Sequence, residues 1–104
     1  MPAIVYPDWR ERVVYSFPGP QPQTLAEMGP FKVVLGGLEP GGKIPLHPEG
    51  AAVYHFLEGT GWMLVDKERY PVKPGVTIIT PPGSERGMEA DTRLAFLAAR
   101  VSEP

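Results

Sequence analysis

The sequence contains no cysteine and only two histidines, and these absences exclude several kinds of site. Without cysteine there is no disulfide framework, no thiolate metal site and no cysteine nucleophile. The apolar runs are only a few residues long, which excludes a membrane-spanning helix. The N-terminal stretch lacks the long apolar core of a secretory signal, so we expect a cytoplasmic protein.

Excess charge is also lacking, because 10 basic and 12 acidic residues leave a net charge of −2. No stretch is basic enough to form a nucleic-acid-binding face. A hydrophobic content of 42% in 104 residues indicates one folded domain with a core of its own. We therefore expect neither a nucleic acid nor a membrane as a partner.

Helix signals are few, whereas turn and strand signals recur along the whole chain. Fourteen prolines and twelve glycines stand between short β-prone runs, which is typical of an all-β domain. Strand and helix patterns do not alternate, so a doubly wound parallel sheet is excluded. Residues 24–28 alone favour a helical turn or two, with Thr24 as the cap. Strands are expected at residues 3–6, 12–17, 31–39, 43–47, 51–57, 62–65, 69–72, 76–80, 85–89 and 93–101.

Two stretches carry the most information. Residues 40–59 read PGGKIPLHPEGAAVYHFLEG, in which a glycine turn leads to His47 and an apolar run ends at Gly59. Residues 70–87 read YPVKPGVTIITPPGSERG, a strand, a tight turn, a second strand and a Pro-Pro-Gly corner. The first stretch leads by a predicted hairpin, residues 59–61, into the strand at residues 62–65.

These stretches resemble the two motifs of the cupin family, a glycine turn with His-x-His, Glu and Gly, and a Gly followed by Pro-x-Gly and His. The resemblance covers roughly residues 31–100. It implies an all-β fold, a single antiparallel jelly-roll (double-stranded β-helix) barrel of the RmlC-like cupin type. Residues 31–104 would then form the barrel, and residues 1–30 an N-terminal arm or added strands, within one structural domain.

The resemblance also implies where a metal site would lie. The family uses three His and one Glu, and its Glu falls at Ala52 and its last His at Arg86. His47 occupies one position of the His-x-His pair, and its partner is either Pro45 or Glu49, an alternative that the sequence leaves open. Three of the four positions thus lack the usual ligand, so we expect no tightly bound metal ion and no other cofactor.

The family's ligand positions also fix which side chains of the alternating strands point into the barrel. The family parity points Ala52, Tyr54 and Phe56 inward, together with Met63 and Val65 on the next strand and Arg86 and Met88 near the end. Arginine binds carboxylates and phosphates, and histidine exchanges a proton near neutral pH. A small anionic organic ligand is therefore expected, and the candidate ligand-binding residues are His47, Glu49, Tyr54, Met63 and Arg86.

Two further interpretations stay open. The chain is alternatively a cupin enzyme, either an isomerase or lyase with His47 and Tyr54 as catalytic candidates, or a metal-dependent oxygenase with an unusual ligand set. It is alternatively a structural or assembly barrel without chemistry, in which Tyr54 fills the interior and Arg86 pairs with a glutamate at the rim. A pocket filled by the chain's own side chains would favour the structural alternative.

The outward parity of the same strands predicts a homodimer. Five side chains on two strands joined by the predicted hairpin would form one apolar outer patch, and such patches mark protein contacts. A two-fold contact between identical chains is the commonest way to cover one. The residues of this expected patch are Val53, His55, Leu57, Trp62 and Leu64.

Overall fold

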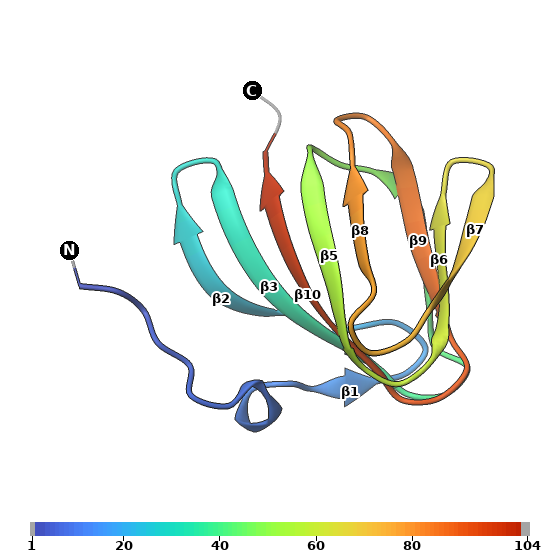
Figure 1. Cartoon of the computed structure of the whole chain (residues 1–104), viewed down its shortest axis with the longest axis horizontal. Coiled ribbons are helices and arrows are strands. Elements are labelled where there is room, and N and C mark those ends of the chain that lie inside the picture. Colours follow the sequence, from blue (N-terminus) through green and yellow to red (C-terminus); the bar gives the residue numbers. More distant parts are fainter. Residues whose placement is uncertain (1, 103–104) are drawn as a thin grey trace.

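The computed structural model describes residues 2–102 and contains two β-sheets that face each other (Figure 1). Residues 1, 103 and 104, which the expected arm and barrel include, lie outside the described part. Sheet A contains β1 (Tyr15–Ser16), β2 (Gln23–Met28), β3 (Phe31–Leu38), β5 (Ala52–Glu58), β8 (Thr77–Thr80) and β10 (Leu94–Val101). Sheet B contains β4 (Lys43–Pro48), β6 (Gly61–Val65), β7 (Glu68–Val72) and β9 (Glu85–Ala90).

The strand order mixes segments that are far apart in the sequence. In sheet A, β10 lies between β3 and β5 and is antiparallel to both, and β8 forms the edge beyond β5. In sheet B, β9 lies between β4 and β6. No strand pairing joins the two sheets within residues 2–102, so the fold is a two-sheet jelly roll and not a continuously hydrogen-bonded barrel. The predicted all-β jelly-roll class is confirmed.

The core lies between the two sheets and follows the predicted alternation. Ala52, Tyr54 and Phe56 on β5 are buried, whereas Val53 between them is 40% exposed. Burying one face of each sheet against the other removes apolar surface from water, and this burial is the main stabilising contribution of such a fold. The core cluster comprises Val34, Leu38, Ala52, Tyr54, Phe56, Met63, Val72, Met88, Ala90, Leu94, Phe96 and Ala98.

The chain passes from sheet A to sheet B at Gly59, a position that requires glycine. Its φ is +85°, in the left-handed region that L side chains rarely adopt. A Cβ atom there would lie 1.6 Å from the carbonyl oxygen of Arg93. The close approach lets the start of β6 pack against the segment that leads into β10.

The sequence predictions for the first thirty residues are partly wrong. Residues 24–28 were expected to form a helical turn, but they belong to β2, which pairs with β3 through a bulge at Leu25. The hydrogen-bonding groups of the β3 edge are satisfied by this pairing, and tertiary context of that kind overrides a weak helix preference. Residues 3–6 form no strand, and the expected strand at residues 12–17 shortens to β1. A single 3₁₀ turn, η1 (Trp9–Glu11), was not predicted.

The expected apolar patch of five residues does not exist as one surface. The prediction assumed that residues 62–65 pair with the preceding strand as a hairpin, but β5 belongs to sheet A and β6 to sheet B. The outward side chains of the two strands, Val53 on β5 and Trp62 on β6 among them, therefore lie on opposite faces of the molecule. The incorrect patch does not bear on whether the chain forms a homodimer.

Within the described part of the chain, no helix has the length and apolar character needed to cross a membrane.

Candidate functional site

Arg86 lies on β9 with its side chain between the sheets, as expected, and is only 1% exposed. Its guanidinium donates hydrogen bonds to backbone carbonyls from two loops. The oxygen atoms of Glu49 and Gly50 accept from it at 3.1 and 2.8 Å, and those of Pro81 and Ser84 at 3.2 and 3.1 Å. Arg86 thereby ties the loop after β4 to the turn before β9.

The ring of Tyr54 lies next to the side chain of this arginine. The guanidinium carbon of Arg86 is 5.9 Å from the centre of the Tyr54 ring, within the range of a cation–π contact. Burial raises the pKa of the Tyr54 phenol, although the neighbouring Arg86 acts in the opposite direction. The phenol is therefore protonated at neutral pH and can donate a proton but not accept one.

His47 and Glu49 lie together at the end of the jelly roll where β4 meets β9. His47 is paired with Arg86 in the register of these strands, so the two side chains lie on the same face. The Nε2 atom of His47 is 3.8 Å from Oε2 of Glu49. Its Nδ1 donates to the carbonyl oxygen of Pro45 at 3.0 Å, and this contact leaves Nε2 unprotonated in the neutral ring. The side chain next to His47 thus comes from Glu49, whereas Pro45 contributes a backbone oxygen.

A second arginine, which sequence reasoning missed, completes this cluster. Nη1 of Arg100 on β10 donates to Oε2 of Glu49 at 3.1 Å. Arg100 is paired with Ala52 on β5 and with Lys32 on β3, so its side chain is on the inner face of sheet A. Arg100 follows the buried Ala98 by two residues, and side chains two residues apart on a strand lie on the same face. This spacing could have identified it.

We call His47, Glu49 and Arg100 the rim cluster. Their side chains are 43%, 29% and 28% exposed, so the cluster is open to water, unlike Arg86. Lys32 lies beside Arg100 on the same face and pairs with Glu27 at 3.5 Å. The rim therefore carries two fixed cations and a histidine, balanced by two carboxylates.

Met63, the remaining candidate, is fully buried in the core. It packs in the cluster that includes Tyr54, Phe56 and Met88. The space between the sheets is filled by these side chains. Of the five residues predicted to bind a ligand, His47 and Glu49 are thus accessible at the rim, whereas Tyr54, Met63 and Arg86 lie beneath it.

The site has too few donor side chains for the metal ion that the family motifs imply. Among residues 2–102, no group of three or more His, Cys, Asp or Glu side chains is placed to hold a metal ion. The family positions Ala52 and Arg86 supply no donor, and Arg86 adds a fixed positive charge. His47 and Glu49 alone do not fit a tightly bound divalent ion, which requires three or more protein donors.

Comparisons with known proteins agree on one family and one fold. The family model described as "Cupin domain" matches residues 34–99. A conserved Streptococcus pyogenes protein of unknown function has 23% identity and a TM-score of 0.84, covering 100% of this chain and 92% of its own. An RmlC-like cupin from Desulfovibrio desulfuricans has 24% identity and a TM-score of 0.78, covering 88% and 90%.

A third solved structure supports the same fold. An uncharacterised Klebsiella pneumoniae protein with a double-stranded β-helix domain has 20% identity and a TM-score of 0.85, covering 97% of this chain and 91% of its own. A comparison with curated proteins gave no match. The three structural likenesses are below 25% identity and concern the fold alone.

Proposed function

Because this chain belongs to the cupin family, we propose that it is a small-molecule-binding cupin that takes an anionic organic ligand at the rim cluster, without a tightly bound metal ion. The observation that carries the proposal is the position of the Glu49 carboxylate. It accepts a hydrogen bond from Arg100 and lies 3.8 Å from His47. Arg100, a group suited to a carboxylate, thus already binds one, and this carboxylate comes from the chain itself.

Glu49 acts in this proposal as an internal competitor. A ligand carboxylate binds Arg100 by displacing Glu49, and it gains a charge-assisted hydrogen bond of the same kind. Lys32, on the same face of sheet A, adds a further positive charge near the entering anion. Arg86 contributes by holding the backbone of Glu49 and Gly50 in place and does not contact the ligand.

The proposal predicts that Glu49→Gln binds small anions more tightly than the unaltered chain does. The substitution keeps the shape of the side chain and removes the competing charge, so affinity for citrate, succinate or inorganic phosphate is expected to rise by about 10-fold. Isothermal titration calorimetry on chelator-dialysed protein measures the change. Arg100→Gln is expected to abolish binding of the same anions.

Glu89→Gln is the matched control, because Glu89 also pairs with an arginine, Arg69 at 3.3 Å, and its side chain is similarly exposed. It should leave anion affinity unchanged. An equal gain in Glu89→Gln, or no binding by either the unaltered chain or Glu49→Gln, would contradict the proposal. One metal ion per chain that survives the chelator and is lost in His47→Ala would restore the metal-enzyme alternative.

The structural-barrel alternative is favoured by one observation, the filled space between the sheets. It predicts that no small molecule raises the melting temperature of the protein, since stabilisation requires a ligand that binds the native state. The non-metal enzyme alternative assigns catalysis to His47 and Tyr54. The unprotonated Nε2 of His47 fits a base in such a reaction. Tyr54 fits a proton donor poorly, because it lies beneath the rim and burial raises its pKa.

A further inference from the structure

Two positively charged residues are paired across neighbouring strands at the rim. Lys32 on β3 is opposite Arg100 on β10, and the two strands are antiparallel. The Cα atoms of such a pair lie about 5 Å apart, and the two side chains are on the same face. Like charges at directly opposite positions destabilise a sheet. The pair thus breaks a local rule, and such exceptions are expected at functional sites.

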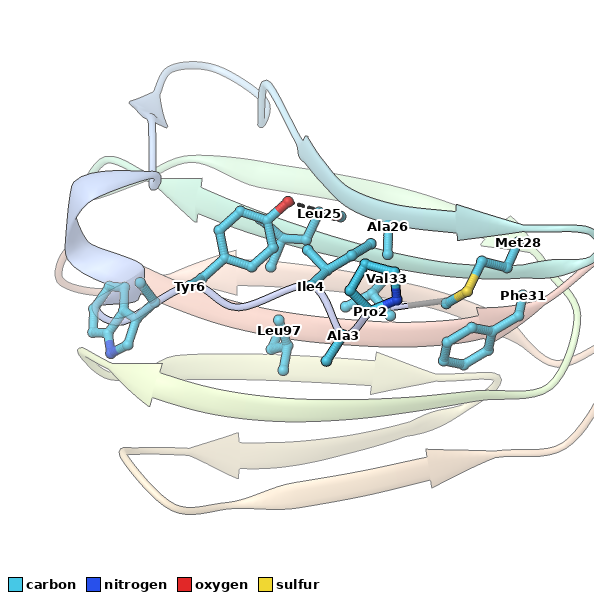
Figure 2. A pocket seen from close by; sticks show the side chains of 11 residues that line it. Pro2, Ala3, Ile4, Tyr6, Leu25, Ala26, Met28, Phe31, Val33 and Leu97 are labelled. Carbon is cyan, nitrogen blue, oxygen red and sulfur yellow. Dashed lines mark hydrogen bonds between the residues drawn. The ribbon is translucent and has the colours of Figure 1, made fainter.

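The other side of sheet A shows which way this pair points. Phe31 and Val33 line an apolar groove beneath the N-terminal arm (Figure 2), so Lys32 between them points to the opposite, inner side. Leu97 lines the same groove, and Arg100, three residues further along β10, therefore also points inward. The groove has a volume of about 580 Å³, and none of the described residues that line it is charged. An anion is therefore better suited to the inner side.

Each of these two cations is held by a carboxylate of the chain itself. Nη1 of Arg100 donates to Oε2 of Glu49 at 3.1 Å, and Nζ of Lys32 lies 3.5 Å from Oε2 of Glu27. Glu27 comes from β2 on one side of the pair, and Glu49 from the loop before β5 on the other. The side chains of Lys32 and Arg100 are 29% and 28% exposed, so water and small solutes can reach both. Two neighbouring cations thus each bind one carboxylate at an open surface.

Apolar side chains lie beneath the cation pair. One step deeper on the inner face, Val34 on β3 is paired with Ala98 on β10, and these residues are 6% and 2% exposed. A ligand that binds both cations places the atoms between its two acidic groups over this apolar pair. Methylene groups gain free energy there by leaving water, whereas a polar group loses hydrogen bonds. Inorganic phosphate has no apolar part that could use this contact.

We propose that the ligand of the rim is an aliphatic dicarboxylate that binds Arg100 with one carboxylate and Lys32 with the other, displacing Glu49 and Glu27. The inference rests on the proposed function and adds Lys32 as a second binding residue. A dicarboxylate neutralises both charges of the unfavourable pair. Once one carboxylate is bound, the other reaches its cation at a high effective concentration. Acids of the length of succinate or glutarate match the spacing of one residue pair.

Isothermal titration calorimetry with glutarate and pentanoate tests the assignment, because these two acids differ only in one end group. The unaltered chain and Glu49→Gln, both dialysed against a chelator, are expected to bind glutarate at least about 10-fold more tightly than pentanoate. Lys32→Gln should bring the two affinities to within about 3-fold of each other, mainly by weakening glutarate. The Lys32 side chain is partly exposed, so this variant should keep its circular dichroism spectrum.

Glu27→Gln gives the opposite expectation. It removes the carboxylate that competes for Lys32 and should raise the affinity for glutarate by about 3-fold or more, with little change for pentanoate. Because the Glu27 side chain is 60% exposed, the substitution should not disturb the fold. A gain of the same size for both acids would contradict the role of Lys32 as a second carboxylate site.

Lys43→Gln is the matched control, because it removes one positive charge from β4 of sheet B, where Lys43 is paired with Glu89. Its preference for glutarate should equal that of the unaltered chain. Equal binding of the two acids by the unaltered chain, or the same loss in Lys32→Gln and Lys43→Gln, would overturn the dicarboxylate assignment while leaving anion binding at Arg100 intact. Binding of neither acid by the unaltered chain or by Glu49→Gln would overturn the proposed function as well.

Discussion

Arg86 shows how a single side chain can look functional in the sequence and be structural in the fold. It is a buried cation whose hydrogen-bond partners are carbonyl oxygens of Glu49, Gly50, Pro81 and Ser84, not a carboxylate. Backbone dipoles thus replace the water that the guanidinium loses on burial. Removing the side chain would take the Arg86 donor away from the carbonyl oxygens of Gly50 and Ser84, whereas those of Glu49 and Pro81 also accept from the backbone amides of Gly83 and Ser84.

We therefore expect Arg86→Met to lower the free energy of unfolding by about 3 kcal/mol or more. Urea denaturation followed by circular dichroism measures the loss. Arg69→Met is the comparison, because the Arg69 side chain is 52% exposed and pairs with Glu89 at the surface. Its cost should be about 1 kcal/mol or less. Equal costs for the two variants would mean that the carbonyl contacts of Arg86 contribute little.

Tyr15 gives a prediction about pH. Burial, followed by its hydrogen bond to Glu58, raises the pKa of Tyr15 from 10.0 to about 12. The folded state thus holds the phenolic proton more tightly than the unfolded state does. The associated stability is present in full below pH 10 and is lost as the pH rises from about 10 to about 12.

Tyr15→Phe removes both the hydroxyl and its titration. The melting temperature of the unaltered chain should exceed that of Tyr15→Phe at pH 8, and the two should converge as the pH approaches 12. Differential scanning fluorimetry over this range makes the comparison. A gap that stays constant between pH 8 and pH 12 would show that the contact with Glu58 does not depend on the proton.

The sequence predicted part of the candidate site and missed part of it, and the difference has a physical cause. The alternation of side chains along a strand correctly placed Tyr54, Met63 and Arg86 between the sheets, because only one face of each strand is buried. Whether an inward side chain is free to bind a ligand depends on the loops around it. The carbonyl groups that surround Arg86 come from loop conformations, which residue spacing does not specify. Arg100 was missed because it belongs to no family motif.

At the scale of elements, the passage from β5 to β6 depends on Gly59. Gly59→Ala is expected to lower the free energy of unfolding by at least about 3 kcal/mol, because its Cβ would overlap the carbonyl oxygen of Arg93. Gly75→Ala is the control, since Gly75 has a similar φ of +96° but open space around it. It should cost about 1–2 kcal/mol through backbone strain alone. Thermal and urea unfolding of both variants would separate the steric overlap from the strain.

The strands after residue 30 were predicted well, and those before it were not. From β3 onwards, glycine and proline turns bound short β-prone runs, and each run was found within a few residues of its expected place. The segment Thr24–Met28 is also bounded by Pro22 and Gly29-Pro30, but its own residues favour a helical turn. Its strand state depends on pairing with the edge of β3, a non-local feature. The incorrect hairpin has a similar cause, because the spacing of two strands does not show which sheet each joins.

At the scale of the whole molecule, the jelly roll has two separate surfaces with different chemistry. The rim cluster is charged and lies where β4, β5 and β10 meet, whereas the outer side of sheet A carries exposed apolar side chains, Val53 and Ile79 among them. Arg100 points to the inner side of sheet A, so these two surfaces lie on opposite sides of the sheet.

The central position of β10 has a consequence for how the protein is made. β3 and β5 leave the ribosome long before Leu94–Val101, yet these residues are what join the two strands into one sheet. Until then each strand presents an unpaired edge, the kind of edge that associates with other chains. Pairings between such distant segments also form slowly. Sheet A can therefore complete its strand pairing only after Leu94–Val101 has been synthesised.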